Sequence, residues 1–171
     1  MADPQESNFF ETGSVVWEIE STDKHDAIRE IVFRAPVFRT VANLDLNGFA
    51  ETVIDRERIQ STGFGHGVAV AHGRTPEVVQ SAVALGVSRK GIDYDSFDGR
   101  PVHLLFIVAN HPEQEMDYLQ ILSALVTLVR NRTFRQELLA CLSCDELQHK
   151  LSCAFHELWY QSPRVQQAVS G

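Results

Sequence analysis

The stretch that decides the fold contains four glycines and two histidines: Gly63-Phe64-Gly65-His66-Gly67-Val68-Ala69-Val70-Ala71-His72-Gly73. Its first part is a glycine-rich loop, whereas Val68 to His72 has the small and β-branched side chains typical of a strand. The pattern therefore predicts a strand that leaves a loop and ends at a histidine. Because glycine permits positive φ and has no side chain, another molecule can approach this backbone closely. We therefore take His72 as the candidate for the chemically active residue.

Strands and helices are predicted to alternate on both sides of this stretch. Apolar segments typical of strands are residues 15–19, 81–87 and 102–108. Residues suited to cap a following amphipathic helix are Asp23, Asp45 and Ser143. A long helix is predicted around Leu119 to Val129, and Pro36 is expected to end the first helix. Alternation of this kind predicts an α/β or α+β domain in which helices cover a sheet.

The composition fits one domain that binds neither nucleic acid nor membranes. The chain has 171 residues, of which 44% are hydrophobic, so we expect a domain at residues 14–161, an N-terminal extension at 1–13 and a C-terminal tail at 162–171. A formal net charge of −8 disfavours nucleic-acid binding, which needs a basic surface. Because the sequence has neither a long apolar run nor a secretion leader, we expect no membrane insertion and a cytoplasmic location.

The segment 56–74 resembles the active-site segment of the EIIA domains of the bacterial phosphoenolpyruvate-dependent phosphotransferase system, of the mannitol, fructose and nitrogen-regulatory type. The matching residues are Arg56-Glu57, Ser61 to Gly65, Gly67 to Val70 and His72-Gly73, and the likeness extends over roughly residues 15 to 152. The resemblance implies an α/β three-layer sandwich with a mixed sheet of about five strands flanked by helices. It also implies that His72 carries a phosphoryl group.

Three positions depart from the family pattern. His66 stands where the family usually has Asn, and Ala71 where it usually has Pro. Family members usually carry a second active-site histidine, and that position is Tyr118 here, 46 residues after His72. His111 lies seven residues upstream of Tyr118, so it can enter the site only if its loop is rearranged. We therefore expect a site with one histidine and one tyrosine.

The resemblance also assigns supporting roles around His72. Arg56 is expected to contact the phosphoryl group or a partner carboxylate, with a surface salt bridge as the alternative. The Thr62 hydroxyl is a candidate donor to phosphoryl oxygens, although a capping or turn role suits it equally well. Tyr118 is expected to donate one hydrogen bond to the phosphoryl group. The candidate partner-binding residues are Phe64, Gly65, His66 and Gly73, with Phe64 either an exposed anchor or a core residue.

No cofactor or metal is predicted. His66 and His72 are too far apart along a straight strand to share a metal, and Cys141 and Cys144 lack a second ligand pair. The Gly-x-Gly-x-Gly run lacks the Lys-Ser/Thr of a nucleotide-binding P-loop, and a strand follows it where a helix would be needed.

The family likeness implies a phosphocarrier that accepts its phosphoryl group from an HPr-like phosphohistidine donor. The acceptor would be an EIIB, or the protein would regulate a transporter or kinase in the manner of the nitrogen-regulatory branch. That branch is expected because the chain carries no recognisable EIIB or membrane domain. Two alternatives remain open: a non-catalytic EIIA-like binding module, to which Ala71 and Tyr118 point, and an unrelated hydrolase that uses His72 as a base.

Overall fold

A computed structural model describes Phe10 and residues 13–161 of the chain. The described strands are β1 (Val15–Val16), β2 (Gly63–Gly65), β3 (Val68–Arg74), β4 (Ala82–Ile92) and β5 (Val102–Asn110). They form one mixed sheet in the order β1-β4-β5-β3-β2. β3 and β5 run parallel, as do β1 and β4, whereas the β4–β5 and β2–β3 pairs are antiparallel. The mixed five-stranded sheet implied by the family resemblance is therefore confirmed.

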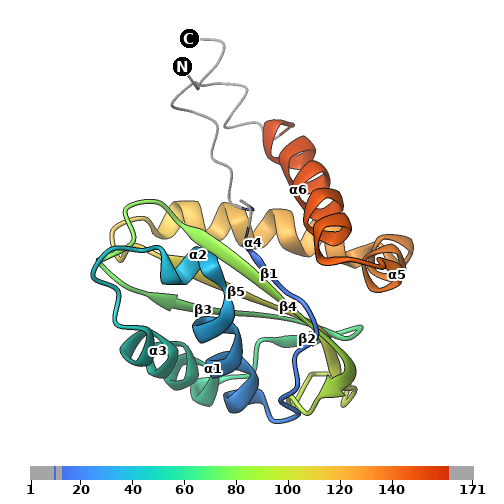
Figure 1. Cartoon of the computed structure of the whole chain (residues 1–171), viewed down its shortest axis with the longest axis horizontal. Coiled ribbons are helices and arrows are strands. Elements are labelled where there is room, and N and C mark those ends of the chain that lie inside the picture. Colours follow the sequence, from blue (N-terminus) through green and yellow to red (C-terminus); the bar gives the residue numbers. More distant parts are fainter. Residues whose placement is uncertain (1–9, 11–12, 162–171) are drawn as a thin grey trace.

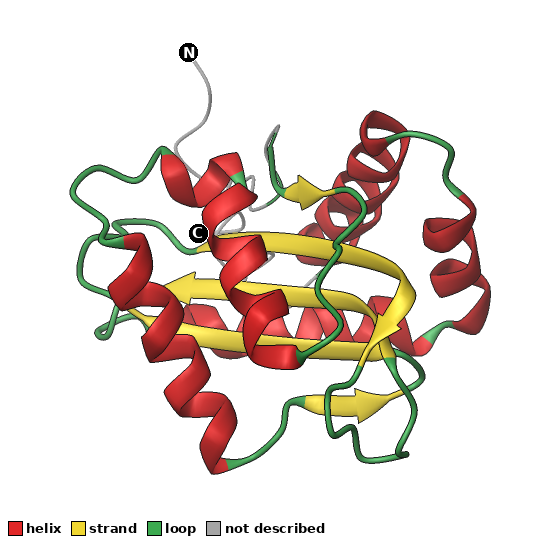
Figure 2. Ribbon diagram, turned by 60° about the horizontal axis from the view of Figure 1, so that its bottom comes forward, coloured by secondary structure: helices red, strands yellow, loops and turns green. Residues whose placement is uncertain are grey.

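Helices cover both faces of this sheet (Figures 1 and 2). The described helices are α1 (Lys24–Arg34), α2 (Pro36–Arg39), α3 (Leu46–Ile59), α4 (Glu115–Arg130), α5 (Arg132–Ala140) and α6 (Cys144–Tyr160). One buried cluster joins α1, α2 and α3 to the sheet, and a second joins α4, α5 and α6 to the opposite face. The molecule is therefore the three-layer sandwich that the resemblance implied.

Capping chemistry sets several of the helix ends. The Asp23 carboxylate accepts hydrogen bonds from the backbone N–H groups of His25 and Asp26, and the Ser143 hydroxyl accepts one from Glu146. Asp45 holds the N-cap position of α3, but its side chain makes no capping hydrogen bond there. Pro36 does end α1 and also opens the short helix α2, because its fixed φ suits the first position of a helix.

The strand lengths differ from those predicted from sequence. β1 contains only two residues of the predicted 15–19, whereas β4 continues beyond 87 to Ile92. β2 lies within the predicted glycine-rich loop. The second half of β4 was not predicted because residues 88–90 are polar, and two of them are exposed.

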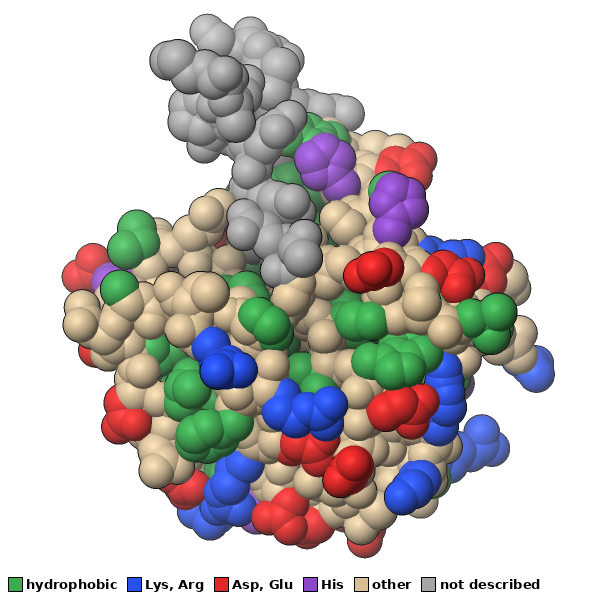
Figure 3. All heavy atoms as spheres, viewed as in Figure 1, with side chains coloured by type: hydrophobic (Ala, Val, Ile, Leu, Met, Phe, Trp, Pro, Cys, Tyr) green, Lys and Arg blue, Asp and Glu red, His purple; other side chains and the backbone are tan. Residues whose placement is uncertain are grey.

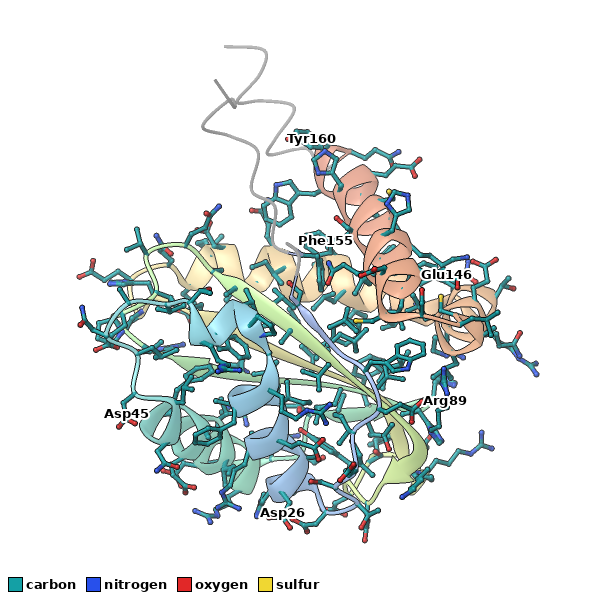
Figure 4. The ribbon with its side chains drawn as sticks, in the orientation of Figure 1. Asp26, Asp45, Arg89, Glu146, Phe155 and Tyr160 are labelled. Carbon is teal, nitrogen blue, oxygen red and sulfur yellow. The ribbon has the colours of Figure 1, made fainter. Side chains whose placement is uncertain are left out.

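Phe10 contributes to the core although it lies in the segment predicted to be an extension. Its side chain is buried, and its ring packs edge-on against Phe106 and Phe155. Phe155 lies on the side of α6 that faces the rest of the domain, whereas Tyr160 lies at its far end (Figure 4). The domain therefore includes at least this residue before residue 14, while the predicted tail at 162–171 lies outside the described residues.

The surface is mostly of mixed charge on the face that carries α1 and α3. Lys and Arg side chains are interspersed with Asp and Glu there (Figure 3). Within the described part of the chain, no helix is long and apolar enough to cross a membrane.

Candidate functional site

His72 lies near the carboxyl end of β3, in register with Val108 of the parallel strand β5. Side chains alternate between the two faces along a strand, so His72 shares a face with Val68 and Val70. Those two valines belong to the cluster beneath α4, and His72 therefore points toward α4. Its side chain is half-buried.

Tyr118 comes from the first turn of α4 and contacts His72 directly. The Tyr118 hydroxyl oxygen lies 3.0 Å from His72 Nδ1, and the two ring centroids are 4.3 Å apart with planes inclined by 30°. Either group can donate this hydrogen bond, because the direction depends on which ring nitrogen carries the proton. When Nδ1–H donates to Tyr118, the lone pair of the ring is on Nε2. The contact thus supplies a partner for one nitrogen and leaves the other to react.

Arg56 approaches His72 from α3, on the opposite side of the sheet edge. α3 packs closely because residue 73 is glycine: a Cβ there would lie 2.8 Å from Val53 Cγ2 and 3.0 Å from Phe49. A hollow of about 240 Å³ opens at this point, and it is lined by Thr52, Arg56, His72, Gly73 and Arg74. A small anion such as a phosphoryl group fits the size and charge of this hollow.

The electrostatic environment keeps the imidazole neutral. Burial, and then the nearby positive charges of Arg56 and Arg74, lower the pKa of His72 from 6.5 to about 4. Burial raises the pKa of Tyr118 above its usual value near 10, although the two arginines oppose the effect. At neutral pH the site therefore contains a neutral imidazole beside a neutral phenol. A neutral imidazole is the form that can act as a nucleophile.

Arg74 forms a second link between β3 and α4. Its Nη2 donates a hydrogen bond to Glu115 Oε1 at 3.1 Å, and both side chains are about half exposed or more. The Arg56 guanidinium has a different partner, because Nη1 donates to the carbonyl oxygen of Gln60 at the end of α3. Two guanidinium groups therefore flank the hollow, one held by a helix end and one by a carboxylate.

Three of the predicted partner-binding residues lie at the other end of β3. His66 and Gly67 form the two-residue turn between β2 and β3, and both have positive φ. Phe64, Gly65 and His66 therefore lie before the start of β3. From Val68 to His72 the strand itself spans roughly 13 Å, at about 3.3 Å per residue. Only Gly73 of that predicted set is beside His72.

The Thr62 hydroxyl is engaged elsewhere. It donates to the buried carboxylate of Glu57, which also accepts hydrogen bonds from the Thr62 backbone N–H and from the Tyr94 hydroxyl. This cluster ties the end of α3 to the segment before β2. His111 Nδ1 accepts from the backbone N–H of Glu113 within its own turn. The predicted roles of Thr62 and of the partner-binding residues remain predictions.

Sequence reasoning missed two features of this site. It did not identify Arg74 or Glu115, and it left open which group binds the second nitrogen of His72. The spacing of these residues was an available signal. His72 and Arg74 are two residues apart and share one face of the strand, and Glu115 and Tyr118 are three residues apart and are neighbours on the helix surface. Within the described ranges, no group of three or more metal-ligating side chains is placed to hold an ion.

Comparisons with known proteins agree with this architecture. The fructose-specific EIIABC component of Bacillus subtilis is 37% identical over 130 residues, which are 75% of this chain and 20% of that protein. The nitrogen regulatory protein IIA-Ntr of Neisseria meningitidis superposes with a TM-score of 0.74 at 29% identity, covering 81% of this chain and 93% of that one. Mannitol IIA of Escherichia coli, in its complex with phosphorylated mannitol IIB, has the same fold, with a TM-score of 0.67 at 18% identity and coverage of 83% and 96%.

The match thus spans only a fifth of the length of the Bacillus relative. The family model described as the phosphoenolpyruvate-dependent sugar phosphotransferase system, EIIA 2, matches residues 8–152. These residues include the whole sheet, all of the helices except the second half of α6, and the hollow beside His72. The chain therefore belongs to the EIIA family of the phosphoenolpyruvate-dependent sugar phosphotransferase system.

Proposed function

We propose that this protein is a phosphocarrier in which Nε2 of His72 accepts a phosphoryl group. The observation that carries the proposal is the hydrogen bond between His72 Nδ1 and the Tyr118 hydroxyl beside the arginine-lined hollow. With Nδ1–H donated to Tyr118, the lone pair of Nε2 is available to attack. The sequence suggested that Tyr118 donates to the phosphoryl group, whereas this contact supports a role in orienting the imidazole.

The transfer itself is a displacement at phosphorus. The Nε2 lone pair forms a new N–P bond in line with the P–N bond of a phosphohistidine on the donor. That bond breaks, and its electron pair returns to the donor imidazole. The proton on Nδ1 stays in place and remains hydrogen-bonded to Tyr118, so no proton transfer to bulk water is required in this step.

The two arginines favour the product over the starting state. Burial is the main cause of the low pKa of His72, and the positive charges of the two arginines lower it further because they disfavour a proton on the ring. The same charges attract the two negative charges of a phosphoryl group on that ring. Groups that stabilise transferring charge in a preorganised site are the largest contributors to many such reactions. Arg56 and Arg74 are therefore proposed to hold the phosphoryl oxygens.

The surface beside the site suits docking of a protein donor. Exposed apolar side chains near the start of α4 are Met116 and Leu119. Val79 is also exposed, and its carbonyl oxygen accepts a hydrogen bond from Gln114, which places it beside the same helix end. An HPr-like donor and an EIIB acceptor are proposed to dock here. Mannitol IIA, which has the same fold, forms a complex with phosphorylated mannitol IIB. Cytoplasmic location and a regulatory role of the nitrogen type are part of the proposal.

A binding module without phosphotransfer is the second candidate, because Tyr118 occupies the position of the usual second histidine. The test is incubation with an HPr-like protein whose histidine is kept phosphorylated by phosphoenolpyruvate and a phosphoenolpyruvate-dependent protein phosphotransferase. Intact mass should then rise by one acid-labile phosphoryl group per chain, and ³¹P NMR should place it on Nε2. Stable binding of the charged donor without any gain in mass would instead support the binding module.

A further inference from the structure

Two pairs of side chains connect β3 to α4, one above the other. His72 and Arg74 are two residues apart on the strand, and Glu115 and Tyr118 are three residues apart on the helix. His72 pairs with Tyr118 at 3.0 Å, and Arg74 pairs with Glu115 at 3.1 Å. The reactive ring and the Arg74–Glu115 ion pair are therefore neighbours on the same two elements.

Arg74 is positioned to change partner. It lines the hollow together with His72, and its charge is close enough to lower the pKa of that ring. Its present bond to Glu115 is exposed to solvent, since 49% of the Arg74 side chain and 63% of the Glu115 side chain are accessible. Exposed ion pairs are weak, and a phosphoryl group offers more charge than a single carboxylate.

We propose that Arg74 is a phosphoryl-binding residue that Glu115 holds in the unmodified protein, and that phosphorylation of His72 moves Arg74 from Glu115 to the phosphoryl oxygens. The proposal rests on the proposed function and extends it to the structural difference between the unmodified and the phosphorylated protein. Glu115 is then left with an unpaired charge close to Asp117 in the first turn of α4, where the helix dipole tolerates negative charge. A partner that contacts this turn can therefore distinguish the phosphorylated from the free protein.

The experiment uses inorganic phosphate as the probe, so that anion binding is measured without transfer. Phosphate is titrated into the full chain while NMR follows the arginine side-chain Nε–H signals. In the wild type, the Arg74 signal should shift with phosphate. Glu115→Gln should tighten phosphate binding about three- to tenfold, because the resident carboxylate is removed, and this gain should disappear in Arg74→Gln/Glu115→Gln.

The matched control is an exposed arginine–aspartate pair on α3, where Arg58 donates to Asp55 at 2.8 Å. Asp55→Asn and Arg58→Gln make the same charge changes and should leave phosphate affinity near that of the wild type. The proposal is overturned if Glu115→Gln acts like Asp55→Asn, or if phosphate shifts Arg56 but leaves Arg74 unchanged. Phosphate binding through Arg74 with no labelling of His72 by a charged donor would contradict the proposed function alone.

Discussion

A histidine lies near each end of β3, and the two histidines have different surroundings. His66 stands in a tight turn with positive φ, and its backbone N–H donates to the Asp98 carboxylate. His72 stands under a helix, with a tyrosine on one nitrogen and two arginines beside the hollow that it lines. The glycines beside His66 allow the tight turn between β2 and β3, whereas the neighbours of His72 include residues of α3 and α4. The surroundings of His72 are therefore set by the helices that pack against β3 and not by the glycine-rich sequence before it.

The largest expected difference between the two ends is in labelling by a charged donor. His72→Ala should abolish the acid-labile phosphate, because it removes the proposed nucleophile. His66→Ala should keep it, since the turn lies roughly 13 Å or more along the strand from the site. Intact-mass measurement of both variants checks this. Residual labelling of His72→Ala, or loss in His66→Ala with an intact fold, would reverse the comparison.

Substitutions of Tyr118 test whether its hydrogen bond to His72 is one reason why His72, and not His66, is expected to be phosphorylated. Tyr118→Phe removes the partner of Nδ1 and should slow phosphorylation of His72, by no more than the roughly 10²–10³-fold expected for losing one preorganised group. Tyr118→His should keep or raise the wild-type rate, because an imidazole can also accept from Nδ1–H. Single-turnover labelling kinetics measure both. Wild-type rates in both variants would remove Tyr118 from the site.

Gly73 tests the packing of α3 against the His72 end. A Cβ at this position would overlap Val53 and Phe49, so Gly73→Ala should lower the free energy of unfolding by about 1–3 kcal/mol. It should also slow labelling, because α3 carries Arg56. Chemical denaturation measures the stability, and adding Val53→Ala should recover part of it. If the two substitutions are simply additive, the predicted overlap is absent.

The pH dependence of stability is a further effect that belongs to the His72 end. The pKa of His72 is about 4 in the folded protein, against about 6.5 when unfolded. Between these values the unfolded chain binds more protons, so the free energy of unfolding should fall as pH drops from 6.5 toward 4. His72→Ala should flatten that decline. Denaturation curves across this range check it, and an NMR signal from a charged His72 at pH 5.5 would contradict it.

The smallest expected effect concerns the turn end. Two-residue hairpin turns with positive φ at both positions favour Asn followed by Gly, and here His66 precedes Gly67. His66→Asn should therefore stabilise the protein by a few tenths up to about 1 kcal/mol. Labelling of His72 should not change. Thermal unfolding measures the gain, and a loss of stability would mean that the His66 ring makes contacts that matter at the turn.

The order of most elements could be predicted from the sequence, because apolar periodicity does not depend on packing details. The place of Tyr118 beside His72 was implied by the family resemblance, which puts a second active-site residue at this position. The helix caps at Asp23 and Ser143 could also be predicted, because a cap depends only on residues close in sequence, and both form as expected. The pairing of Arg74 with Glu115 could not be predicted in this way, because it depends on the register between β3 and α4. The burial of Phe10 was hidden for the same reason, since an aromatic residue in a polar segment gives no periodic signal.

The shortness of β2 has a consequence for association between copies of the protein. Its pairing with β3 reaches only as far as the bond from Val70 N–H to the Thr62 carbonyl. N–H groups alternate in direction along a strand, so those of His72 and Arg74 also point to the side that β2 leaves open. An uncovered strand edge invites the strands of other molecules, and charged side chains on it discourage them. A charged residue such as Arg74 on this edge is therefore expected to disfavour pairing with the strand of another molecule, and an apolar residue at this position is expected to lower solubility.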